Sequence, residues 1–135
     1  MIHWSKLEYF KKEEFNHPEQ MDSIHLVKID ILRANIGESI KITSDFREGD
    51  DGYHGKGLAT DLQCPKIGLY EFYQQAERHN FNGIGIYPHW NTPGIHVDSR
   101  PLIGGMGARW ICIKVDGKQK YIALNEDNLK KYILN

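Results

Sequence analysis

The sequence predicts a single α+β domain, residues 1–135, with a mainly antiparallel sheet. Segments with helical apolar spacing dominate the first half of the chain, and short strand-like segments separated by turn residues cluster in the second half. Helices and strands do not alternate regularly, as they would in a βαβ fold. With 135 residues, 40% of them hydrophobic, the chain is large enough to bury one core, and it shows no repeat or linker.

Four segments are predicted to be helical. Ser5 and Glu8 form a capping box, so a short first helix is expected over about residues 6–12. The longest segment has apolar residues at helical spacing over 19–36 and ends at Gly37, a typical C-terminal stop. The other two segments are 68–79, and 127–134 with Asn125 as N-cap.

Six short segments have the alternation or the β-branched and aromatic content of strands. Between the last two, Asp116-Gly117 predicts a tight hairpin turn. Residues 47–56 are rich in glycine and aspartate and are expected to form a loop. The predicted strands are 39–44, 57–62, 83–87, 95–99, 109–115 and 120–124.

Charge and composition exclude several classes of protein. Lys and Arg total 17 against 18 Asp and Glu, a net charge of -1, so no positive field exists to hold nucleic acid or an anionic membrane. We expect a monomer without either partner. Residues 1–8 lack a basic region followed by an apolar run, so no signal peptide is expected. Two cysteines, Cys64 and Cys112, are too few for a disulfide scaffold and are expected to be buried thiols.

Three residues stand out as metal ligands: His54 in the glycine-rich loop, Asp61 in the strand that follows, and His96 in a later strand. Imidazole and carboxylate are the donors that catalytic Zn²⁺ takes, with three protein ligands leaving the fourth position for water. Gly55 and Gly57 permit the sharp turn that folds His54 over the same sheet edge as Asp61.

On the residues alone, a second interpretation stands beside the metal site. A solvated loop histidine, a surface aspartate and a hydrogen-bonded strand histidine account for the same positions. Four other histidines need no special role, because His25 lies on the long helix and the other three lie near element ends: His3, His17 and His79.

Three segments resemble one family of zinc enzymes. His54-Gly55-Lys56-Gly57-Leu58-Ala59-Thr60-Asp61 is similar to the H-x-x-G-x-A-x-D element of the zinc D-Ala-D-Ala carboxypeptidases and L-alanyl-D-glutamate endopeptidases. Gly94-Ile95-His96-Val97-Asp98 resembles the third-ligand strand of their H-x-D branch, and Ser44-Asp45-Phe46-Arg47 resembles their S-x-x-R segment. The resemblance covers about residues 40–109. It implies the Hedgehog/DD-peptidase fold, with helices on one side of the sheet, and one Zn²⁺ held by His54, Asp61 and His96.

The resemblance also implies candidate catalytic groups, with one departure. Many members carry a catalytic Glu or Asp three residues before the third ligand, where this chain has Pro93. Asp98 is then the expected general base, or else a carboxylate that fixes an imidazole tautomer. His89 is the second candidate for the base.

Substrate-binding residues are predicted around these groups. The resemblance gives Arg47 the task of holding a substrate carboxylate or a developing oxyanion, with Ser44 orienting it, although a solvated arginine is the simpler alternative. Tyr87 and Trp90, with other aromatic residues, are expected to line a groove unless they belong to the core.

The predicted function is a zinc metallopeptidase that hydrolyses peptide bonds in bacterial peptidoglycan stem peptides or crosslinks, as a carboxypeptidase or as an endolysin-like endopeptidase. The alternative is a catalytically silent, zinc-stabilised module that binds a peptide or a protein, because Pro93 replaces the usual acid. Without a signal peptide, the chain is expected in the cytoplasm of the producing cell, with phage encoding and release to the cell wall as one setting.

Overall fold

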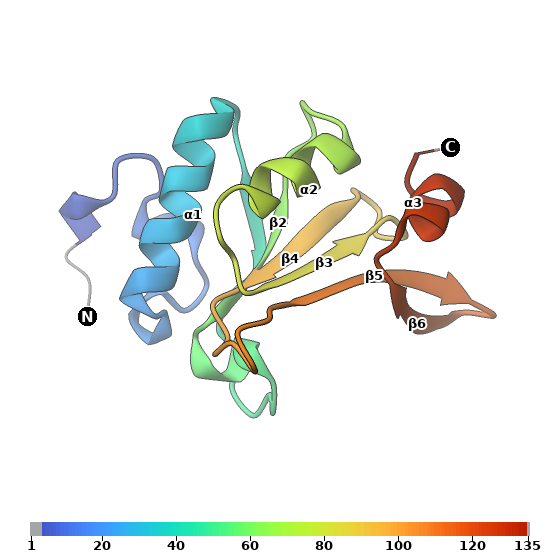
Figure 1. Cartoon of the computed structure of the whole chain (residues 1–135). Helices are drawn as coiled ribbons and strands as arrows, with labels where there is room; N and C mark the ends of the chain where they lie inside the picture. Colours follow the sequence, from blue (N-terminus) through green and yellow to red (C-terminus); the bar gives the residue numbers. More distant parts are fainter. Residues whose placement is uncertain (1–3, 135) are drawn as a thin grey trace.

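The computed structural model describes residues 4–134. Its strands are β1 (Lys41–Ser44), β2 (Ala59–Gln63), β3 (Gly83–Tyr87), β4 (Gly94–Asp98), β5 (Ala108–Val115) and β6 (Lys118–Ala123). They form one sheet in the order β1-β2-β4-β3-β5-β6 (Figure 1). β3 and β5 run parallel, and every other neighbouring pair in the described residues is antiparallel. The predicted α+β class with a mainly antiparallel sheet is confirmed.

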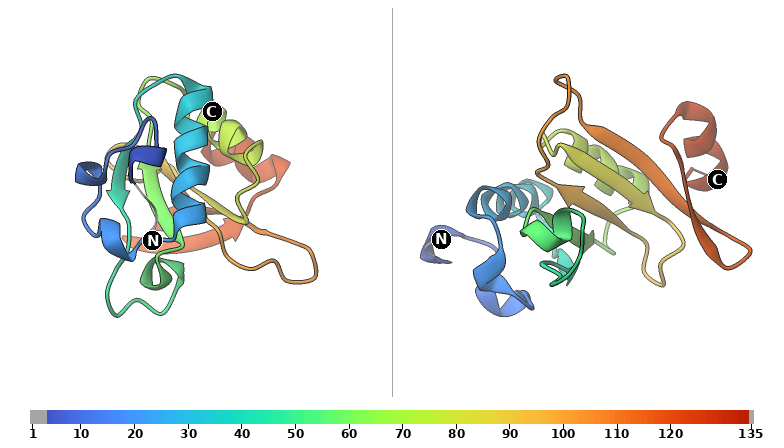
Figure 2. Two further views of the ribbon diagram at one scale, coloured as in Figure 1. Left: turned by 90° about the vertical axis from the view of Figure 1, so that its left-hand side faces the viewer. Right: turned by 90° about the horizontal axis from the view of Figure 1, so that it is seen from below.

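Three α-helices lie on the same side of this sheet: α1 (Ser23–Ile36), α2 (Leu69–Glu77) and α3 (Glu126–Tyr132) (Figure 1). α2 packs on β3 and β4 and contacts α1, and α1 and α3 lie toward opposite ends of the molecule (Figure 2). Phe72 and Ala76 of α2 share the buried core with Ile84 and Ile95 from the sheet. The apolar core therefore lies between the helices and one face of the sheet.

The helix predicted over residues 6–12 does not form. That segment holds two 3₁₀ turns, Trp4–Lys6 and Lys12–Glu14. Between them, the backbone N–H groups of residues 8–10 donate to the carboxylate of Asp30 on α1 at 2.8–3.0 Å. A capped α-helix would use these N–H groups for its own hydrogen bonds. Because they bond to the Asp30 carboxylate instead, the predicted helix does not form despite the local capping signal.

The other helix and turn signals agree with the structure. The N-cap of α1 is Asp22, because Pro18–Gln20 forms a separate 3₁₀ turn before it. α1 ends at Gly37, whose φ of 75° is the left-handed conformation of a C-terminal stop. The predicted turn Asp116-Gly117, with positive φ at both residues, connects β5 to β6. Asn125 caps α3, as predicted.

His25 on α1 has a structural role that its sequence position does not indicate. Its side chain is completely buried, with Nδ1 2.7 Å from Ser99 Oγ and Nε2 3.0 Å from Thr60 Oγ1. It joins α1 to β2 and to the residue that follows β4. Burial lowers the pKa of His25 to about 3, so the imidazole is neutral in the folded protein.

The two faces of the sheet carry different side chains. Thr60 contacts α1 and Val97 belongs to the apolar core, whereas Asp61 and His96, their neighbours in sequence, point to the opposite face. On that face one residue from each of five adjacent strands pairs in register. We call this set the register row, and its members are Ser44, Asp61, His96, Gly85 and Trp110.

The longest helix, α1, has 14 residues, fewer than the about 20 needed to cross a bilayer. No helix within residues 4–134 combines the length and the apolar character of a membrane span. Cys64 and Cys112 are buried free thiols, as predicted.

Candidate metal centre

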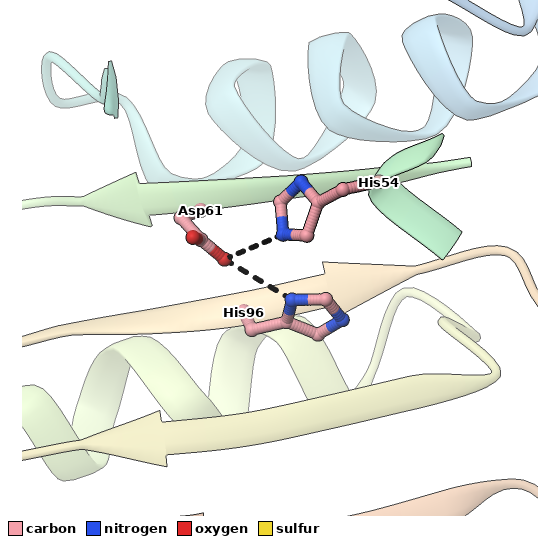
Figure 3. A group of neighbouring side chains, drawn as sticks. All are labelled: His54, Asp61 and His96. Atoms are coloured by element: carbon pink, nitrogen blue, oxygen red, sulfur yellow. Dashed lines mark hydrogen bonds and ion pairs between the residues drawn. The ribbon is translucent and has the colours of Figure 1, made fainter. Parts of the chain in front are cut away.

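Three buried side chains from separate elements converge on the face of the sheet that is turned away from the helices (Figure 3). His54 lies on a 3₁₀ turn, η4 (Tyr53–Lys56), Asp61 on β2 and His96 on β4. One nitrogen or oxygen atom from each lies within 4.8 Å of the others. These three residues, predicted as ligands from the sequence, are close enough to hold one metal ion.

Two glycines allow the turn that carries His54. Gly57 has a φ of 70°, and a Cβ there would lie 2.0 Å from the carbonyl oxygen of Gln20. A Cβ at Gly55 would lie 1.9 Å from the carbonyl oxygen of Asp50. Both positions therefore require glycine, which explains their spacing after His54.

His54 presents an unpaired nitrogen to the centre of this group. Its Nδ1 donates to the carbonyl oxygen of Asp45 at 2.8 Å, which leaves Nε2 with its lone pair in the neutral ring. Nε2 is buried, lies 3.3 Å from Asp61 Oδ1, and has no hydrogen-bond partner in the described residues. A buried nitrogen lone pair that faces a carboxylate oxygen is unfavourable unless a proton or a metal cation lies between them.

His96 is held between two carboxylates. Its Nε2 donates to Asp98 Oδ2 at 2.7 Å, and its Nδ1 lies 3.1 Å from Asp61 Oδ1. Burial lowers the pKa of His96, but the two carboxylates outweigh burial and raise it above its usual value. Since Nε2 is engaged by Asp98, Nδ1 is the atom that faces a metal beside His54.

The donor set therefore fits one divalent cation. His54 Nε2, His96 Nδ1 and an Asp61 oxygen point toward one place, and their chemistry is that of a three-ligand zinc site. Burial raises the pKa of Asp61, but the contacts with His54 and His96 lower it to about 2, so the carboxylate is ionised.

Arg47 and Ser44 lie beside the ligands as the sequence predicts. Arg47 donates through Nη2 to Asp61 Oδ2 at 3.2 Å and through Nε to Ser44 Oγ at 2.9 Å. A third bond joins Nη1 to Asp50 Oδ2 at 3.3 Å. The Arg47 side chain is still 48% exposed, so the guanidinium is oriented by three oxygens and reaches solvent in the same cavity.

The surroundings of the Asp98 carboxylate differ from those expected of a general base. Its carboxylate has no exposed area, and its two oxygens accept from His96, from the Arg100 backbone N–H and from the Arg100 guanidinium at 2.6–3.1 Å. Burial raises the pKa of Asp98, but Arg100 and His96 lower it well below its usual value. A Cβ at Gly83 would lie 2.3 Å from this carboxylate, so glycine makes room for it. The geometry favours the second predicted role, fixing the tautomer of His96, over the role of base.

His89, the other candidate base, does not line the cavity at the metal group. Its Nδ1 donates to the carbonyl oxygen of Cys112 at 3.1 Å, and its Nε2 lies 3.4 Å from Gln119 Nε2. These contacts hold the ring against β5 and β6. The prediction that His89 substitutes as the base is therefore not supported by its position.

An open cavity of about 370 Å³ surrounds the metal group. Tyr87 and Trp90 line it, as predicted, and their rings stack with centroids 4.4 Å apart. Other lining residues are Arg47, Asp50, Tyr53, Arg100, Trp110, Gln119 and Tyr121. The cavity thus combines aromatic walls with polar groups near the three ligands.

Arg100 is the main cavity residue that the sequence pattern does not reveal. Its guanidinium lies 4.6 Å from the Tyr53 ring centroid and 5.2 Å from that of Trp110, while it also bonds Asp98. The only sequence signal is its position two residues after Asp98, just beyond the end of β4. Arg100 thus connects the turn that carries His54 with the strand that carries His96.

Asp98→Asn tests the role of this carboxylate. If Asp98 fixes His96, the variant should bind zinc roughly 10–100-fold more weakly, and any metal-dependent activity that it loses should return at high zinc. Metal titration and activity assays at several zinc concentrations measure this. Asp116→Asn, in an exposed turn at a φ of 51° that asparagine tolerates, is the matched control. A fall in kcat of about 10²–10⁴ with unchanged zinc content would instead make Asp98 the base.

A scan against protein-family models and searches of curated proteins and of solved structures found no match to this chain.

Proposed function

We propose that the chain is a zinc metallopeptidase that hydrolyses peptide bonds in bacterial peptidoglycan stem peptides or their crosslinks. The observation that carries the proposal is the unpaired, buried Nε2 of His54, which faces Asp61 beside His96 inside an open cavity. The motif resemblance of the same three residues to zinc D-Ala-D-Ala carboxypeptidases and L-alanyl-D-glutamate endopeptidases names the substrate class. A setting in which the protein reaches the wall after release, as from a phage-infected cell, belongs to this proposal.

The residues around the ligands have separate tasks in this proposal. Bound Zn²⁺ would polarise a substrate carbonyl and lower the pKa of water toward ~7. Arg47, held by Ser44 and Asp61, directs N–H groups at a substrate oxygen in the cavity. Asp98 keeps the hydrogen of His96 on Nε2, so that Nδ1 is free as a ligand. The aromatic walls restrict where a peptide can lie.

One observation favours the alternative of a catalytically silent, metal-stabilised binding module. Two carboxylates line the cavity in the described part of the chain, and both are already engaged. Asp61 faces the two histidines, and Asp50 accepts from Arg47 and from the Gly52 N–H. Neither is a free general base in this arrangement.

Digestion of purified peptidoglycan separates the two functions. The zinc-loaded protein should release muropeptides with new amine or carboxyl termini, and a chelator should stop the release. Mass spectrometry of the products identifies the bond, because terminal D-Ala, an L-Ala–D-Glu linkage and a crosslink give different masses. Binding to peptidoglycan without any new terminus, at full zinc content, would contradict the peptidase and support the binding module.

A further inference from the structure

Strand β3 has an unusual composition on the cavity face, with two glycines followed by Tyr87. A Cβ at Gly85 would lie 2.3 Å from Trp110 Nε1, so the indole of Trp110 lies directly over the backbone of β3. Gly85 also pairs with His96 in the register row, and the ring centroids of Trp110 and His96 are 5.3 Å apart. The indole N–H is therefore placed next to the third metal ligand.

That indole N–H is used for one bond, to the hydroxyl of Tyr87. Trp110 Nε1 donates to Tyr87 Oη at 3.1 Å. The indole nitrogen is only a donor, so the tyrosine oxygen must accept here. The hydroxyl hydrogen of Tyr87 then points elsewhere, and no residue within 4–134 accepts it.

The surroundings of Tyr87 direct this hydrogen into the cavity. The ring is 8% exposed and lies stacked on Trp90 with 16° between the planes, which fixes its orientation. The side chain nevertheless lines the cavity beside Asp61 and His96. Burial raises the pKa of Tyr87 well above its usual value, so the hydroxyl keeps its hydrogen at neutral pH.

Tyr87 and Arg47 approach the metal group from different sides. Arg47 bonds to Ser44 and Asp61, the members of the register row on β1 and β2. The Trp110 indole lies on the other side of His96, over β3 and β5. The Arg47 guanidinium and the Tyr87 phenol therefore belong to different sides of His96 and line the same cavity.

Resting on the proposed peptidase function, we propose that the Tyr87 hydroxyl donates a hydrogen bond to the carbonyl oxygen of the scissile amide. Trp110 is the positioning residue, because its N–H occupies the lone pair of Tyr87 and turns the hydroxyl hydrogen toward the substrate. The bond strengthens as negative charge develops on that oxygen, so it acts mainly in the transition state. The expected substrate is therefore an amide whose carbonyl oxygen can reach both the Arg47 guanidinium and the Tyr87 hydroxyl.

Tyr87→Phe removes the hydroxyl and keeps the ring stack. The variant should lose about 10²–10³-fold in kcat on muropeptides, as for a deleted oxyanion donor, with KM raised by no more than about 2–10-fold and zinc content near that of the wild type. Trp110→Phe should lose less, because the hydroxyl remains but is no longer directed. The double variant should be no slower than Tyr87→Phe, which shows that Trp110 acts through Tyr87. Tyr9→Phe, at an exposed tyrosine outside the cavity, is the control.

A binding measurement gives a second readout that does not depend on turnover. N-acetyl-D-Ala-D-Ala is titrated by calorimetry into zinc-free protein, which cannot hydrolyse it, and Tyr87→Phe should weaken its affinity about 2–10-fold, the value of one neutral hydrogen bond. Weaker binding by Tyr87→Phe with no hydrolysis by the wild type would keep the Tyr87 contact and overturn the peptidase. Full kcat in Tyr87→Phe would overturn the role of Tyr87. If the wild type is inactive, equal probe affinity of the two proteins, or no probe binding by the wild type, would overturn it as well.

Discussion

Replacement of His54 by alanine is expected to abolish metal binding and to lower the unfolding temperature of the zinc-loaded protein by on the order of 10–20 °C. A ligand at 1,000 times its dissociation constant stabilises the folded state by about 4 kcal/mol, and each kcal/mol shifts the melting point of a domain of this size by about 3–5 °C. The effect is large because a bound metal would join η4 to β2 and β4 and would satisfy the buried Nε2 of His54, which has no hydrogen-bond partner in the described residues. The proposed peptidase activity should fall to the level of chelated wild type.

Elemental analysis and thermal unfolding with and without chelator measure these changes. One zinc per chain is expected in the wild type and none in His54→Ala. His79→Ala, in which the substituted ring contacts Asn35 and Gln75 far from the cavity, should retain one zinc and the wild-type response to chelator. Failure of the wild type to take up added zinc, or a melting curve that chelator leaves unchanged, would contradict the metal centre.

Acid pH is expected to destabilise the folded protein through His25. The folded protein holds this imidazole neutral, with a pKa of about 3, whereas the unfolded chain has the ordinary value of 6.5. As pH falls below 6.5 the unfolded state takes up a proton that the folded state does not, so stability falls progressively until about pH 3. The total loss from this one group is on the order of 5 kcal/mol.

Chemical denaturation of metal-free protein between pH 7.5 and 4 tests this effect. His25→Gln cannot take up a proton at this position. The slope of its free energy of unfolding against pH should therefore be smaller than that of the wild type, by an amount that corresponds to at most one proton taken up on unfolding. His96, whose raised pKa favours the folded state at low pH, is present in both proteins and cancels in the difference. The variant should be less stable than the wild type at pH 7.5, and the gap should narrow toward pH 4. Parallel profiles for the two proteins would contradict the buried neutral histidine.

Most of the fold follows from local patterns, because alternation, capping and turn residues act over a few neighbours. The strands, the end of α1 at Gly37 and the Asp116-Gly117 hairpin are of this kind. The failed helix near the N-terminus shows the limit. There a carboxylate more than 20 positions away, Asp30, takes the backbone donors, and no local pattern contains that information.

Some residues of the candidate site could likewise be predicted from local sequence, and others could not. His54, Asp61 and His96 could be named from the sequence, because His54 and Asp61 share one short segment with two glycines, and this segment and that of His96 both resemble motifs of one family of zinc enzymes. The choice between the two predicted roles of Asp98, and the task of Arg100, could not be made from the sequence, since they depend on Gly83 leaving space and on two aromatic rings from other elements. A carboxylate two residues from a ligand looks the same in sequence whether it faces the cavity or a guanidinium.

The register row limits the places at which residues can be inserted into this chain. Side chains alternate along a strand, so one residue inserted within β2 before Asp61 would turn that carboxylate from the cavity into the apolar core. The same insertion between Arg47 and Gly52, in a loop outside the strands, leaves every pairing intact. Homologous chains that keep the metal should therefore differ in length in their loops and have strands of constant length between Ser44 and Trp110.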